Sequence, residues 1–137
     1  MNNNGGTEMV TDIHIKEVQN RVDKVWLRED GIVQTVVFPG AEYTLVDAKQ
    51  NLASIVQVSN GKRLPLLVDI RNAKTMERAA RQLFATDEWV TSTALLIDSA
   101  LSRMIGNAFI TFSKPVIPTR LFTSEAEAVE WLKGFLK

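Results

Sequence analysis

The chain has 137 residues, no cysteine, a single histidine, and sixteen acidic side chains balanced by sixteen basic ones, so its formal net charge is zero. This length suits one folded domain whose core needs no disulfide. Cysteine chemistry is excluded, and zero net charge gives no overall field that would attract a nucleic acid or an anionic membrane.

The first residues are rich in asparagine and glycine, and they contain too few apolar groups to offset the entropy of ordering them. We therefore predict a flexible arm over residues 1–12 and a single domain over residues 13–137. The start of the chain has neither the basic nor the apolar region of a secretory signal, and no apolar run reaches the ~20 residues that span a bilayer. These features predict a cytoplasmic protein.

The next segments predict a hairpin followed by a helix. Residues 25–28 and 32–38 are rich in β-formers and flank an Asp30-Gly31 turn, a strong hairpin signal. Thr44 and Asp47 then have the spacing of a helix cap, and apolar residues recur at helical spacing until Asn60-Gly61.

The second half of the chain alternates strands with helices. Residues 64–70 and 93–98 are nearly continuous apolar runs, typical of parallel strands covered on both faces. Helices are predicted to begin at Thr75, Ser99 and Ser124, with a short strand at residues 119–122 before the last one. This order predicts an α/β fold with a single, mostly parallel sheet, helices alternating with strands, and an N-terminal antiparallel hairpin.

Two aspartates mark the place where a site is expected. Asp69 and Asp98 each end a predicted central strand, and adjacent parallel strands would bring both to one edge of the sheet, where ligands of open α/β sheets bind. Polar residues around this edge form a candidate interaction or phosphorylation surface: Asp69, Arg71, Asn72, Thr75, Asp98, Ser99, Arg103 and Thr123. The competing interpretation is structural, with Thr75, Ser99 and Ser124 capping helices and the aspartates bonding loop amides.

Motifs of common catalytic and cofactor sites are missing from the sequence. His14 is the only imidazole, and the seven glycines form neither a dinucleotide-binding nor a phosphate-binding loop. We therefore expect no metal, no cofactor and no enzymatic activity; catalysis by Asp69 and Asp98 as a carboxylate pair is the weakest hypothesis. The three tryptophans stand on different elements, which favours core packing over a nucleic-acid stacking platform.

The predicted helix from Ser99 to Phe112 is more apolar than a helix with one buried face needs to be. Its excess of apolar residues predicts a contact with a partner subunit, a lining for a lipid-sized pocket, or deep burial under the last helix.

Residues 26–136 resemble the bacterial STAS-like, SpoIIAA-like family of small uncharacterised domains. The resemblance is carried by residues 26–32, by the strand at residues 66–71, and above all by the tail from Ile117 to Leu132. It implies the fold predicted above and a non-enzymatic regulatory or protein-interaction role, which we expect to involve a homodimer.

One departure from the superfamily pattern limits that implication. The anti-sigma-factor antagonists that typify the superfamily carry a phosphorylatable serine after the third strand, whereas the matching segment here, residues 69–78, offers only Thr75 as a hydroxyl. The resemblance therefore does not carry over the phosphorylation. A distant similarity of fold to CRAL-TRIO lipid carriers leaves an alternative function open, the binding of a small apolar or acidic ligand.

Overall fold

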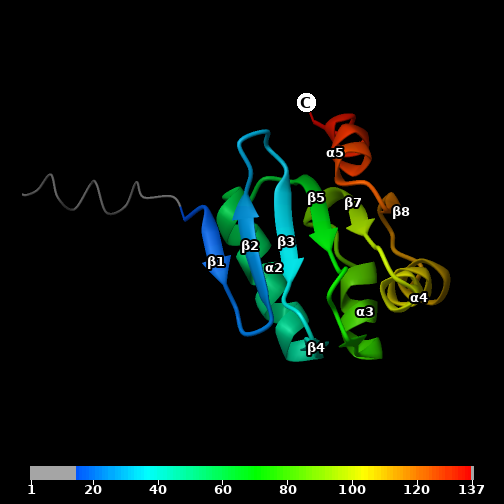
Figure 1. Ribbon diagram of the computed structural model, residues 1–137. Coiled ribbons are helices and arrows are strands. Elements are labelled where there is room, and N and C mark those ends of the chain that lie inside the picture. The colour runs from blue at the N-terminus through cyan, green and yellow to red at the C-terminus, as the bar shows by residue number, and fades with distance from the viewer. Residues whose placement is uncertain (1–14, 137) are drawn as a thin grey trace, which may run out of the picture.

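The computed structural model describes residues 15–136, so the predicted arm at residues 1–12 and His14 lie outside the described residues. A six-stranded sheet forms the centre of the molecule, in the order β1-β2-β3-β5-β7-β8 (Figure 1). Its strands are β1 (Glu17–Gln19), β2 (Asp23–Leu27), β3 (Val33–Val37), β5 (Leu64–Asp69), β7 (Val90–Leu96) and β8 (Thr119–Phe122). The pairs β1-β2 and β2-β3 are antiparallel and the rest are parallel, which confirms the predicted fold class.

Helices cover both faces of the sheet. On one face lie α2 (Leu45–Ser59), α3 (Arg78–Ala85) and α4 (Ala100–Ala108), while α5 (Glu125–Lys133) lies on the other; Figure 1 shows α2 behind β2 and β3. Leu66 packs with Ile55 of α2, and its neighbour Leu67 packs with Leu132 of α5. Successive residues of a strand point to opposite faces, so β5 is buried on both sides, which explains its continuous apolar run.

The boundaries of α2 agree with the prediction. The Thr44 hydroxyl accepts a hydrogen bond from the Asp47 amide, and the Asp47 carboxylate accepts one from the Thr44 amide at 2.9 Å, forming a capping box. The helix ends at Asn60, whose φ of 56° is in the left-handed region that asparagine tolerates better than most residues.

The predicted helix start at Thr75 is wrong. Thr75–Met76 form β6, a two-residue strand that pairs in parallel with β4 (Glu42–Tyr43), and α3 begins only at Arg78. The amides of Lys74 and Thr75 both donate to the carbonyl of Ala41, so this stretch of backbone pairs with a distant segment before the helix begins. Such long-range pairing leaves no periodic signal in the local sequence.

The helix predicted from Ser99 to Phe112 changes character partway. Its α-helical part ends at Ala108, and Phe109–Ser113 form a π-helix, η1, that closes at Lys114 with a φ of 53°. The wider turn holds Phe109 in the core and leaves Phe112 in solvent. Trp89 is also exposed, so the prediction that every tryptophan packs in the core is wrong for this residue.

Candidate functional site

The structure brings Asp69 and Asp98 to the same edge of the sheet, as the sequence predicts. β5 and β7 are parallel neighbours, with Asp69 opposite Leu96, and the Ile70 amide donates to the Leu96 carbonyl at 3.2 Å. Asp98 follows β7 after one further residue. The carboxyl ends of the two central strands therefore form one rim, at which both aspartates leave the sheet.

At this rim, Asp69 is held by Arg71. The Arg71 guanidinium donates to both carboxylate oxygens of Asp69, at 2.9 and 2.7 Å, and the Arg71 amide adds a third bond at 3.0 Å. Glu125, at the start of α5, lies 4.0 Å from the same guanidinium. Hydrogen bonding to Asp69 raises the pKa of Arg71, with smaller contributions from the charges of Glu125 and Asp98. Asp69 is thus an ion-pair partner of Arg71, and both of its carboxylate oxygens already accept hydrogen bonds.

Ser99 and Ser102 build the N-terminus of α4. The buried Ser102 hydroxyl accepts bonds from the amides of Asp98 and Ser99, at 2.9 and 3.0 Å, while the Ser99 hydroxyl accepts from the Ser102 amide at 3.1 Å. The structural interpretation of Ser99 as a helix cap is therefore confirmed. Asp98 itself is exposed beside this cap.

The other candidate residues do not join one cluster. Thr75 lies exposed on β6, in the separate two-stranded sheet. Thr123 is exposed directly after β8, which ends beside β7 at the same carboxyl edge, with Phe122 opposite Leu96. Asn72 is exposed too, while its carbonyl accepts from the Gly40 amide at 3.0 Å. Arg103 lies on the outer face of α4. The predicted surface therefore separates into an ion-paired rim and the outside of α4.

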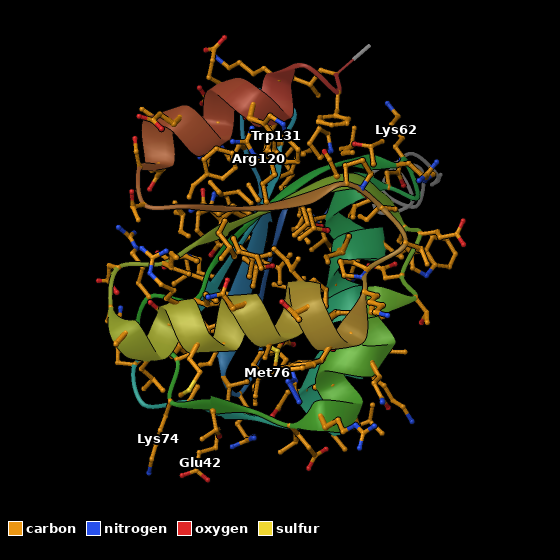
Figure 2. All side chains as sticks on the ribbon, turned by 90° about the vertical axis from the view of Figure 1, so that its right-hand side faces the viewer. Glu42, Lys62, Lys74, Met76, Arg120 and Trp131 are labelled. Carbon is orange, nitrogen blue, oxygen red and sulfur yellow. The ribbon has the colours of Figure 1, made fainter. Side chains whose placement is uncertain are left out.

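The outer face of α4 is an exposed apolar surface. Met104 and Phe112 are 62% and 79% exposed and line a shallow depression, while Leu101 nearby in sequence is 41% exposed. In Figure 2 the helix crosses the front of the molecule with no other ribbon before it. Ile105 and Phe109 on the opposite side are buried. The excess of apolar residues noted in the sequence therefore faces solvent. We call Ala100, Met104, Ala108 and Phe112 the α4 stripe.

A buried polar network around Asp23 has no counterpart in the sequence predictions. The carboxylate is fully buried and accepts hydrogen bonds from the Tyr43 hydroxyl at 2.6 Å, from Asn51 at 2.9 Å and from Asn20 at 2.9 Å. Burial, together with the charge of Asp23, raises the pKa of Tyr43. These donors lie up to 28 residues from Asp23 in the sequence, so no local motif connects them.

Within residues 15–136, no group of three or more carboxylate, imidazole or thiol side chains is arranged to hold a metal ion. The helices of this part of the chain are also too short or too polar to cross a membrane.

A family model matches residues 25–136 of the chain. Among solved structures, an uncharacterised protein of the DUF3478 family with a SpoIIAA-like fold from Shewanella loihica is 16% identical, with a TM-score of 0.53, covering 86% of this chain and 91% of its own. A protein of unknown function from an Arthrobacter species is 32% identical, with a TM-score of 0.34, covering 79% and 96%. The search of curated proteins finds no match. The first likeness confirms the SpoIIAA-like fold.

Proposed function

The chain belongs to the family described as Domain of unknown function (DUF7793), and from this starting point we propose that it is a non-catalytic, regulatory interaction domain that pairs with a second copy through the α4 stripe. The observation that carries the proposal is the exposure of Met104 and Phe112 on one side of a helix. Contiguous apolar surface of this kind is typical of protein contacts. The pairing of Asp69 with Arg71 supports the non-catalytic part.

The α4 stripe has a shape that suits a copy of itself. Its residues are spaced four apart and alternate small with large: Ala100, Met104, Ala108 and Phe112. If two copies of α4 cross antiparallel through their outer faces, with the two-fold axis at the level of residue 106 along the helix, Phe112 faces Ala100 of the second copy and Met104 faces its Ala108. Each large side chain then meets a small one, as an isologous interface requires.

Exposed residues of opposite charge also stand just beyond the two ends of the α4 stripe in the sequence, Asp98 before it and Lys114 after it. Asp98 and Lys114 each stand eight positions from Gly106, on opposite sides of it, so the antiparallel pairing brings Asp98 of one copy to Lys114 of the other. Both side chains are exposed, and within residues 15–136 neither has an ion-pair partner. Exposed ion pairs add little affinity, but they select one orientation of the two helices.

Sedimentation velocity over a range of micromolar concentrations tests the pairing. We expect the native chain to form a dimer and the Met104→Glu and Phe112→Glu variants to remain monomers, with unchanged circular dichroism because both side chains are exposed. Val46→Glu is the matched control, since Val46 is 63% exposed on α2, outside the stripe. A native chain that stays monomeric throughout, or a Val46→Glu variant that dissociates as Met104→Glu does, would contradict the proposal.

A charge exchange tests the orientation. Asp98→Lys and Lys114→Asp should each weaken the dimer, because each places like charges opposite one another, and the double variant should restore it. Two results would show that the copies pair in a different arrangement. One is a dimer that the stripe variants leave intact and the charge variants dissociate. The other is a dimer that the stripe variants dissociate and the double charge variant does not restore.

A further inference from the structure

A partly enclosed pocket lies behind α4, between that helix and the sheet. Val68 and Leu95 form part of its wall on the sheet, and Met76, Phe84 and Ile105 close it from the helical side. In Figure 2, Met76 lies directly below α4. The space open to the centre of a water molecule is about 50 Å³.

This size limits what the pocket can hold. A single buried water needs about 10–15 Å³ by the same measure, whereas an engineered cavity of about 150 Å³ binds benzene. A molecule of a few non-hydrogen atoms would therefore enter without repacking. A longer one would require Met76 and Phe84 to move, and both are only partly buried, with methionine the more adaptable of the two.

The polar groups in the wall define the chemistry that fits. Most lining side chains are apolar, and none is a lysine, arginine or histidine, so the wall offers no positive charge to an acidic ligand. Asp87 is the one acid among the lining residues; it is 8% exposed, and burial raises the pKa of its carboxyl. One of its oxygens accepts from the Trp89 amide at 2.8 Å.

Thr93 supplies a second polar group to this wall. It is 8% exposed, and within the described part of the chain its hydroxyl makes no hydrogen bond. Among residues 15–136 this oxygen is not one of the fully buried, unpaired side-chain atoms, so it is open to the space of the pocket. A second carboxylate oxygen of Asp87 likewise has no partner among residues 15–136. The pocket therefore combines an apolar wall with unused hydrogen-bonding capacity.

We propose that this pocket binds a small apolar molecule that carries a hydrogen-bond-donating end, a hydroxyl or an amine, received by Thr93 and Asp87. The inference is independent of the pairing through the α4 stripe. It retains the apolar half of the ligand hypothesis raised by the sequence. It replaces the acidic half, since an anion in the pocket would meet Asp87 while no lysine, arginine or histidine lines the wall.

Three probes of three carbon atoms each test this: 1-propanol, 1-propylamine and propionate. Each is titrated into the full chain while methyl NMR signals of Leu66, Ile70, Leu95 and Ile105, which line the pocket, are followed. We expect the alcohol or the amine to shift these signals and saturate in the millimolar range, the two probes distinguishing a neutral from a cationic end. Propionate should leave them unchanged. The absence of saturation by both donors, or equal binding of propionate, would overturn the proposal.

Variants locate the binding. Thr93→Val keeps the side-chain shape and removes the hydroxyl, and it should raise the Kd of the bound donor about fivefold, as the loss of one hydrogen bond implies. Thr91→Val on the same strand is the matched control, because Thr91 does not line the pocket. Val68→Ile adds one methylene to the wall and should also weaken binding. If neither pocket variant changes the Kd, or if Thr91→Val changes it equally, the pocket is not the site.

Discussion

Asp23 shows how one side chain organises the interior near β2. Its carboxylate is fully buried and its hydrogen-bond partners are the uncharged side chains of Asn20, Tyr43 and Asn51. A carboxyl group in such a buried position is tolerated only where several hydrogen-bond donors replace its lost hydration. The network also ties β2 to β4 and α2, because Tyr43 and Asn51 come from those elements.

Asp23→Ala should destabilise the fold strongly. The substitution removes the shared acceptor of Tyr43, Asn51 and the partly buried Asn20, which keep only their second bonds, to the Asp47 carbonyl, Thr35 and Ser54. At about 1 kcal/mol for each hydrogen bond lost, the destabilisation should be about 3 kcal/mol. Tyr43→Phe removes one donor only and should cost about 1 kcal/mol. Urea denaturation measures both, with Glu29→Ala at an exposed site as the control. A loss below 1 kcal/mol for Asp23→Ala would show that the network contributes little.

Asp47 gives stability a dependence on pH. Burial alone would raise the pKa of this carboxyl, but hydrogen bonds from Thr44 and Arg21 outweigh burial and lower it. The unfolded chain then takes up this proton at a higher pH than the folded chain does. The stabilisation is therefore complete above the ordinary carboxyl pKa of about 4, and it disappears as pH falls through the lower, folded value.

The Asp47→Asn variant should lose that dependence. Between about pH 6 and about pH 3, its free energy of unfolding should fall less than that of the native chain, because one of the carboxylates lost on acidification is already absent. Urea midpoints at several pH values measure the difference. Glu29→Gln, at an exposed carboxylate, should retain the native slope; an identical slope in Asp47→Asn would contradict the assignment.

At this scale the sequence predicted part of the candidate site. The common position of Asp69 and Asp98 follows from strand order alone, because neighbouring parallel strands end at the same edge of the sheet. Arg71, the partner of Asp69, is only two residues away in the sequence. The second contact of Arg71, with Glu125, depends on where α5 begins in space. Asp23 and Thr93 could not be singled out, because burial and unfilled hydrogen-bonding capacity are created by segments far apart in the chain.

Among the elements, both ends of α2 and the start of α4 were the easiest to predict, since helix caps depend on neighbouring residues in the sequence. Thr44, Ser99 and Asn60 act through residues at most four positions away. The β4-β6 pair and η1 were not predicted. The first depends on Ala41 meeting Lys74 and Thr75 across the fold, and the second on the packing of Phe109 against Leu95.

The cap of α4 should be sensitive to Ser102. Ser102→Ala leaves the amides of Asp98 and Ser99 without their acceptor and should cost about 2 kcal/mol, together with faster hydrogen exchange in the first turn of α4. Ser113→Ala, at the far end of η1, is the control. Unchanged exchange in residues 99–103 would show that the cap does not hold this turn.

Two substitutions of Asn60, at the end of α2, should differ in their effect on stability. At its φ of 56°, Asn60→Gly removes the strain of a side chain and should leave stability unchanged or slightly raised, whereas Asn60→Ala should cost about 1 kcal/mol. Thermal unfolding compares the two variants directly. Equal melting temperatures would mean that the left-handed conformation is not retained in the alanine variant.

For the molecule as a whole, pairing through the α4 stripe predicts that stability depends on protein concentration. Dimerisation stabilises the folded chain by mass action, so the Tm of the native chain should rise as concentration is increased. The Tm of Met104→Glu should stay constant over the same range, because the monomer has no such contribution. Calorimetry at several concentrations separates the two behaviours, and a flat native series would contradict the pairing.

α4 and η1 are a single layer of backbone between two environments, with Ile105 and Phe109 turned to the pocket and Met104 and Phe112 turned outward. A ligand in the pocket that shifts α4 and η1 even slightly also shifts the α4 stripe, which a second subunit would contact. Inner occupancy and outer association then become reciprocal, each changing the other's equilibrium constant by the same factor. In that arrangement α4 and η1 would couple the binding of a small molecule inside the protein to the association of subunits outside it.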